Sequence, residues 1–119
     1  MAGKRILYIE DNAQNRLLAR KLLAGAGFEM TEAADGLAGI EAAGREPPDL
    51  ILLDMSMPGM DGYAVATRLR ATPVLAQVPI VAVTAHAMSG DRERTLISGC
   101  DGYFPKPIDI ERFADQVRG

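Results

Sequence analysis

The chain has 119 residues, a length typical of one domain, with 48% hydrophobic and 24% charged residues. Its net charge of −3 gives no basic surface for nucleic acid. No apolar run approaches the roughly 20 residues that span a bilayer, and the single cysteine, Cys100, excludes an intramolecular disulfide. We therefore expect one cytoplasmic domain over residues 1–119 that binds neither nucleic acid nor membranes directly.

Strand-like and helix-like segments alternate from the start of the chain. The first predicted strand, 6–9, leads into a leucine-rich helix. The run 28–33 alternates apolar and polar residues, which is typical of a half-covered edge strand. Asp35 is placed to cap a short helix with Leu37 and Ile40 facing the core.

The second half of the chain continues the alternation. Two runs, 50–53 and 80–83, are continuously apolar, as strands buried on both faces are, and a helix with apolar residues four apart lies between them. The segment 89–98 predicts a helix with a thin apolar stripe. A short last strand at 103–104 precedes a final helix that Asp109 can cap.

Five strands alternating with five helices predict an α/β fold, a doubly wound parallel sheet of the flavodoxin-like kind. Right-handed crossovers place the three apolar strands in the middle of the sheet. The strand order 2-1-3-4-5 fits best, because it puts the alternating second strand at an edge.

Polar residues follow four of the five strands: Glu10 and Asp11 the first, Asp54 the third, Thr84 the fourth and Lys106 the last. Because parallel strands share one carboxyl-end rim, these residues converge beside the topological switch point. Three crowded carboxylates need a cation, and Mg²⁺ prefers such oxygen ligands. An ionised aspartate can attack a phosphoryl group without a general base, while Mg²⁺ and the lysine neutralise charge and the threonine hydroxyl donates to a phosphoryl oxygen.

Each of these residues alone has an ordinary explanation, such as a helix cap for Asp54. A magnesium-dependent phosphatase of the haloacid dehalogenase type would need a second aspartate where Ser56 stands. Flavin or nucleotide binding would need a phosphate-binding loop that the chain lacks. The only histidine, His86, has no role in the proposed chemistry, and Tyr103 fits core packing as well as function.

The chain resembles the receiver (REC, CheY-like) domain of two-component response regulators over essentially its whole length. Four stretches carry the resemblance: 6–12, 50–62, 81–85 and 103–107. Asn12 and Asn15 add a similarity to single-domain regulators of the DivK type and to hybrid-kinase receivers. A complete single-domain regulator and a receiver excised from a longer protein both remain open, with the first preferred.

The resemblance implies that Asp54 accepts a phosphoryl group from a phosphohistidine on a histidine kinase or a histidine phosphotransfer protein. It also implies that Glu10, Asp11, Asp54 and the backbone carbonyl of Ser56 surround Mg²⁺. Such a domain is a switch that modifies itself and slowly loses its phosphate, and it is not a turnover enzyme. A receiver-shaped scaffold that binds partners without phosphorylation is the remaining rival.

Further expectations concern the output of the switch. By resemblance, Thr84 and Lys106 stabilise the phosphoryl group, and Tyr103 changes rotamer and remodels the face formed by the fourth helix, the last strand and the last helix. Ser56 and His86 occupy positions that tune phosphoryl lifetime in the family. We expect a monomer or a weak phosphorylation-dependent dimer; the kinase, the downstream effector and the pathway are not encoded in these motifs.

Overall fold

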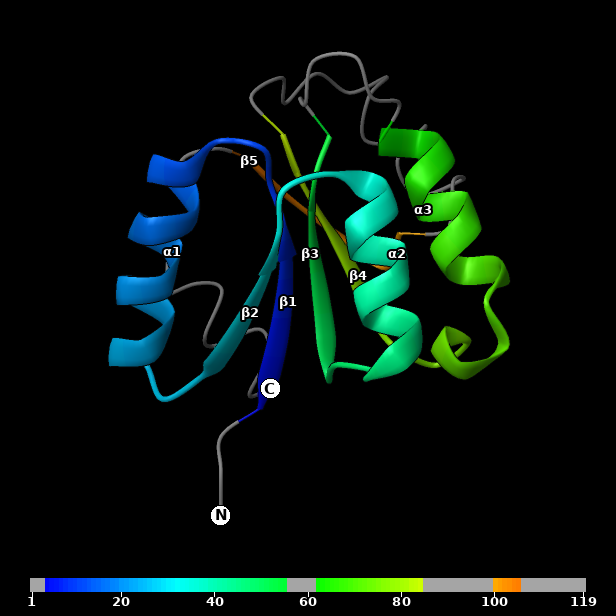
Figure 1. Cartoon of the computed structure of the whole chain (residues 1–119), viewed down its shortest axis with the longest axis horizontal. Helices are drawn as coiled ribbons and strands as arrows, with labels where there is room; N and C mark the ends of the chain where they lie inside the picture. The colour runs from blue at the N-terminus through cyan, green and yellow to red at the C-terminus, as the bar shows by residue number, and fades with distance from the viewer. Residues whose placement is uncertain (1–3, 56–61, 85–99, 106–119) are drawn as a thin grey trace.

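The computed structural model describes residues 4–55, 62–84 and 100–105. Five parallel strands form one sheet in the order β2-β1-β3-β4-β5, which confirms the predicted order (Figure 1). The strands are β1 (Arg5–Ile9), β2 (Glu29–Ala33), β3 (Leu50–Asp54), β4 (Ile80–Thr84) and β5 (Gly102–Pro105).

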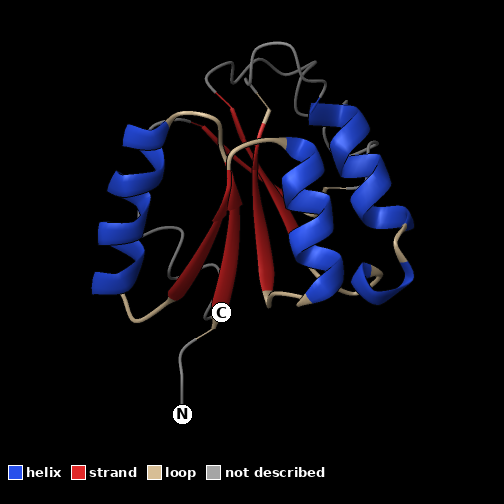
Figure 2. Cartoon of the chain, in the orientation of Figure 1, coloured by secondary structure: helices blue, strands red, loops and turns tan. Residues whose placement is uncertain are grey.

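Helices cover both faces of the sheet, as the doubly wound prediction requires (Figure 2). Helix α1 (Ala13–Gly25) packs on one face, and α2 (Gly36–Arg45) and α3 (Gly62–Ala71) pack on the other, followed by a short 3₁₀ turn, η1 (Pro73–Leu75). The predicted fourth and fifth helices lie outside the described residues. Within the described ranges, no helix has both the length and the apolar character needed to cross a membrane.

The burial of the strands follows their sequence patterns. All five residues of β3 are buried, and β1 is buried from its second residue onward. In β2, exposed and half-buried residues alternate until the buried Ala33, so the predicted edge strand is confirmed. The buried hydrophobic side chains form two clusters, one under α1 and one under α2 and α3. Because helices cover both faces, the carboxyl-end rim is where polar side chains can gather.

The prediction that Leu37 faces the core is wrong, because its side chain is 63% exposed. Helix α2 meets the sheet through small residues, including Gly39 and Ala43. A Cβ atom at Gly39 would lie only 2.4 Å from Cδ1 of Ile9, so the helix comes too close to β1 for a larger residue there. Ile40 is half-buried against the core, as expected, whereas the leucine is exposed.

Candidate metal centre

Three carboxylates lie together at the carboxyl ends of two neighbouring strands. Glu10 and Asp11 follow β1, and Asp54 ends β3. One carboxylate oxygen from each residue lies within 4.8 Å of the others. Glu10 is 1% exposed and Asp54 2% exposed, while Asp11 lies at the surface. Strands that are distant in the sequence thus bring these three acids to one point.

Backbone hydrogen bonds that continue past the strand ends fix these positions. The Glu10 amide donates to the carbonyl of Ala33 in β2, at 3.0 Å. The amide of Met55 donates to the carbonyl of Val83 in β4, at 2.9 Å. These bonds extend the sheet pairing by one residue on each side of the carboxylates. Glu10 and Asp54 are therefore held at the strand ends, while Asp11 lies in the bend that follows Glu10.

The start of α1 is capped by Asn12, whose side-chain oxygen accepts from the amide of Asn15 at 3.0 Å. The cap of this helix is therefore Asn12 and not the preceding residue, Asp11. Asparagine caps a helix as well as aspartate does, because its carbonyl oxygen can accept the same amide. The Asp11 carboxylate lies instead with the other two acids.

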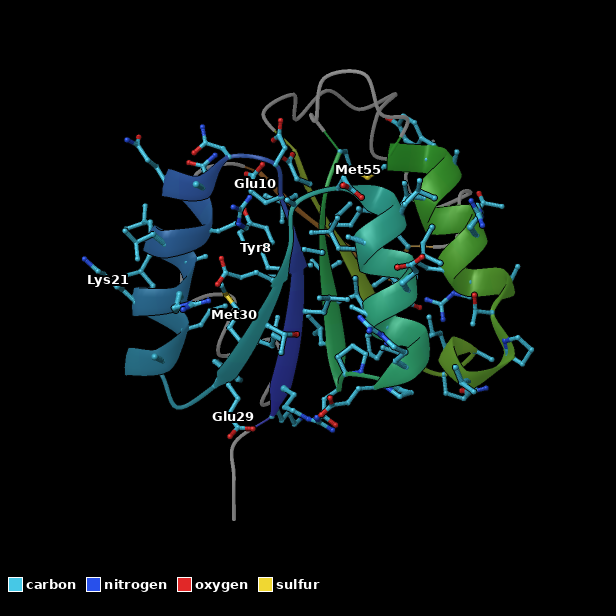
Figure 3. The ribbon with its side chains drawn as sticks, viewed as in Figure 1. Tyr8, Glu10, Lys21, Glu29, Met30 and Met55 are labelled. Carbon is cyan, nitrogen blue, oxygen red and sulfur yellow. The ribbon has the colours of Figure 1, made fainter. Side chains whose placement is uncertain are left out.

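Hydrogen bonds orient the buried Glu10 carboxylate. The Asn15 side-chain amide donates to its Oε1 at 3.0 Å, and the Tyr8 hydroxyl donates to the same oxygen at 3.4 Å (Figure 3). The backbone amide of Asn12 donates to Oε2, also at 3.4 Å. Sequence reasoning missed Tyr8, although residues two apart on a strand share a face. Burial above all, then the charges of Glu10 and Asp54, raises the pKa of Tyr8, so its hydroxyl stays protonated and keeps donating.

The donor set fits a hard divalent cation. Two buried carboxylates and one exposed carboxylate repel one another strongly when nothing offsets their charge. Mg²⁺ binds carboxylate oxygens in an octahedral arrangement and completes its shell with water or phosphate oxygens. The surface position of Asp11 leaves one side of the cluster open to such ligands. These residues could therefore hold a hard divalent cation such as Mg²⁺.

The other predicted site residues divide into two groups. Thr84 is the last residue of β4, the strand next to β3, so its backbone lies on the same rim as Asp54. Tyr103 lies in β5 at the edge of the sheet. Ser56, His86 and Lys106 lie outside the described residues, and their roles stay predictions.

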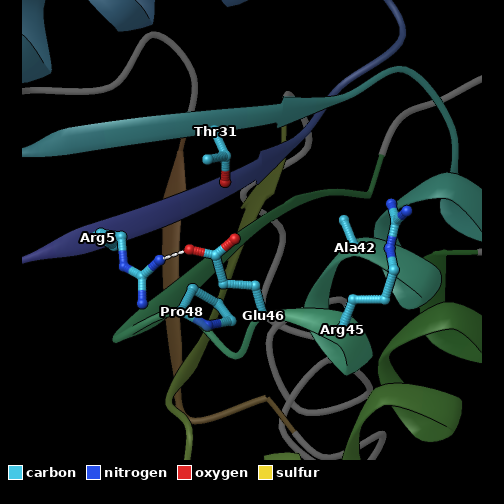
Figure 4. A pocket seen from close by; sticks show the side chains of 6 residues that line it. All are labelled: Arg5, Thr31, Ala42, Arg45, Glu46 and Pro48. Carbon is cyan, nitrogen blue, oxygen red and sulfur yellow. Dashed lines mark hydrogen bonds and ion pairs between the residues drawn. The ribbon is translucent and has the colours of Figure 1, made fainter.

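A separate pocket of about 280 Å³ lies near the amino ends of the strands (Figure 4). Its principal ion pair joins the guanidinium of Arg5 to the carboxylate of Glu46. The backbone amide of Arg5 also donates to the Asp49 side chain at 2.8 Å. None of the three clustered carboxylates lines this pocket, so it is no part of the metal centre. Its lining consists of Arg5, Thr31, Ala42, Arg45, Glu46 and Pro48.

Comparison with known proteins gives a consistent result. The family model of the response regulator receiver domain matches residues 6–118. The polar-differentiation response regulator DivK of Brucella anthropi is 37% identical over 115 residues, which cover 97% of this chain and 94% of that protein. The similarity thus extends over nearly the full length of both chains.

Solved structures agree with the sequence match. The receiver domain of sensor histidine kinase PA1611 from Pseudomonas aeruginosa has a TM-score of 0.88 and 36% identity, covering 98% of this chain and 96% of that one. That structure holds a magnesium ion in its active site cleft. The chemotaxis protein CheY4 of Vibrio cholerae has a TM-score of 0.90 and 25% identity, with 98% of each chain covered.

Proposed function

Because the chain belongs to the family of response regulator receiver domains, we propose that Asp54 accepts a phosphoryl group in a Mg²⁺-dependent phosphorelay. The donor is a phosphohistidine on a histidine kinase or a histidine phosphotransfer protein. The observation that carries this proposal is the cluster of Glu10, Asp11 and Asp54 at the ends of adjacent strands. The magnesium ion of the similar Pseudomonas receiver supports the choice of ion.

The chemistry follows from the charges at the site. A carboxylate oxygen of Asp54 attacks phosphorus, the P–N bond to the donor imidazole breaks, and the imidazole nitrogen keeps the bonding pair. No general base is needed, because an ionised carboxylate is already the nucleophile. Mg²⁺ supplies charge neutralisation when bound, and Glu10 and Asp11 would hold it beside Asp54. The product is an acyl phosphate that water hydrolyses slowly.

The remaining roles in the proposal follow from the family. The Ser56 carbonyl completes the metal ligands, and Thr84 and Lys106 contact the phosphoryl group. Tyr103 transmits the change to the face of the fourth helix, the last strand and the last helix, where a protein partner binds. Ser56 and His86 set the lifetime of the acyl phosphate. The domain then acts in the cytoplasm as a self-modifying switch, monomeric or weakly dimeric when phosphorylated, and not as a turnover enzyme.

Labelling with acetyl phosphate tests the proposal. The protein is incubated with Mg²⁺ and ³²P-acetyl phosphate, and alkali-labile label should appear on the wild type and disappear in Asp54→Asn or in EDTA. Asp49→Asn is the matched control, because Asp49 lies just before the other end of β3. An asparagine side chain there can still accept the hydrogen bond from the Arg5 amide. Equal, alkali-stable label in the wild type and in Asp54→Asn, or no label in the wild type, would support the scaffold alternative instead.

The Lys106→Ala variant distinguishes acceptance of the phosphoryl group from the structural change that follows it. The variant should still take up label, because the nucleophile and the metal ligands are intact. Its phosphorylation-induced changes in amide chemical shifts should be lost, because the ammonium no longer binds the phosphoryl oxygens. If phosphorylation changes the amide chemical shifts of this variant as much as those of the wild type, Lys106 does not couple phosphorylation to output.

A further inference from the structure

The side chain of Arg16 joins three parts of the structure around the metal centre. From helix α1, its Nη1 donates to the backbone carbonyls of Glu10, at 2.7 Å, and of Asp11, at 3.0 Å. Its Nε donates to Oε1 of Glu32 in β2, at 3.2 Å. The side chain is only 18% exposed, and that of Glu32 20%. The Arg16 guanidinium thus links the backbone of Glu10 and Asp11, here called the acidic turn, to helix α1 and to the edge strand β2.

The two carbonyls that Arg16 binds belong to the peptide groups on either side of Asp11. Holding both peptide planes fixes the backbone dihedrals of that residue and so the direction of its Cα–Cβ bond. This matters more for Asp11 than for Glu10. Burial and the Asn15 side chain already orient the Glu10 carboxylate, whereas Asp11 is exposed, so burial does not orient it.

We propose that Arg16 is a positioning residue of the metal centre, which sets the direction of the Asp11 carboxylate toward Glu10 and Asp54. The inference rests on the proposed Mg²⁺ role of these acids. Mg²⁺ tolerates little departure from octahedral geometry, with oxygens at about 2.0–2.1 Å, so a small shift of one ligand lowers its affinity. Groups that orient metal ligands typically contribute about 10- to 100-fold in affinity.

Because Arg16 is positively charged, the direction of the change in Mg²⁺ affinity on its substitution distinguishes a positioning role from a purely electrostatic one. A cationic side chain beside the site repels Mg²⁺, so loss of its charge alone would tighten metal binding. Loss of positioning would weaken it. Arg20 provides the comparison, because its guanidinium pairs with the same Glu32 carboxylate. Among the described residues, Arg20 forms no side-chain hydrogen bond or ion pair with Glu10 or Asp11 in the acidic turn. Its side chain is 57% exposed.

Calorimetric titration of the full chain with MgCl₂ tests the inference. We expect Arg16→Gln to bind Mg²⁺ about 10-fold more weakly than the wild type, although it removes a positive charge. Arg16→Lys keeps the charge but cannot span both carbonyls and Glu32, so it should also bind several-fold more weakly. Arg20→Gln should bind within about twofold of the wild type, or more tightly.

Acetyl phosphate kinetics give a second measure. The Mg²⁺ concentration for half-maximal labelling should rise in Arg16→Gln by the same factor as the dissociation constant. The rate at saturating Mg²⁺ should fall much less, because Asp54 itself is unchanged. A variant damaged throughout the fold would lose the maximal rate as well.

The outcomes separate this inference from the proposed function. Wild-type or tighter Mg²⁺ binding by Arg16→Gln would overturn the positioning role, and so would equal weakening by Arg20→Gln. Absence of Mg²⁺ binding in the wild type would instead refute the proposed function. If circular dichroism shows that Arg16→Gln does not fold, Arg16→Lys decides the question, and wild-type affinity in that variant rejects the inference.

Discussion

Removing one carboxylate from the metal centre should stabilise the metal-free protein. In Asp54→Asn, the repulsion between Asp54 and the two neighbouring acids disappears. At the 4.8 Å limit, two unit charges repel by about 3 kcal/mol with an effective dielectric constant near 20. The pair with buried Glu10 contributes most, since solvent screens the pair with exposed Asp11. We expect a net gain of about 1–3 kcal/mol in the free energy of unfolding at low salt, because some of this repulsion is relaxed in the native protein.

Urea unfolding in EDTA and in excess MgCl₂ measures this effect. By the proposed function, Mg²⁺ would bind and stabilise the folded wild type, so the advantage of Asp54→Asn should shrink or reverse when the ion is present. Glu29→Gln is the control, because it makes the same charge change at an exposed position at the far end of β2 (Figure 3). An Asp54→Asn variant no more stable than the wild type in EDTA would refute the repulsion argument, as would equal stabilisation by Glu29→Gln.

Three other predictions concern the fold around the site. Gly39→Ala should destabilise the protein by about 1–3 kcal/mol in urea, because its Cβ would lie 2.4 Å from Ile9, whereas Gly44→Ala in the same helix meets nothing within 4 Å and should stabilise by about 0.5–1 kcal/mol. Asp35→Ala should lower the free energy of unfolding by about 1 kcal/mol in urea, because Asp35 Oδ1 accepts from the Ala38 amide at 2.8 Å and caps α2. An unchanged urea midpoint would show that this cap does not stabilise the protein. Burial, with a neighbouring carboxylate second, raises the pKa of Cys100 from 9.0 to about 11, so its stability contribution is complete below pH 9 and lost as the pH rises through 11. Cys100→Ala should flatten that alkaline loss by about 2–3 kcal/mol, and an identical pH profile would show that the thiol does not titrate as assigned.

The sheet could be predicted because its strands differ in pattern. The continuous apolar run of β3 requires burial on both faces, and the alternation of β2 requires an edge. From these two patterns the strand order follows, and from the order follows the meeting of Glu10 with Asp54. The outline of the metal centre is thus a consequence of topology that single residues could not reveal.

What could not be predicted depends on contacts across elements. The exposure of Leu37 follows from how closely α2 approaches Ile9, and no helical periodicity encodes that distance. The link from Arg16 to Glu32 joins a helix to a strand 16 positions away, and it depends on the arginine rotamer. The sequence predicts Tyr8 only as a strand residue, because its hydrogen bond to Glu10 depends on the turn that follows β1.

The parallel pairing of β1 with β3 determines how the cluster of three carboxylates is assembled. Everything from α1 to the end of α2 lies between Asp11 and Asp54 along the chain, yet β1 and β3 lie side by side and bring the acids together. A cut in the connection at 46–49 would leave Glu10 and Asp11 on one fragment and Asp54 on the other. Neither fragment alone would contain the cluster, and mixing them would restore it only to the extent that they reassemble the sheet. The carboxylate cluster therefore depends on the pairing of β1 with β3, and neither strand holds it alone.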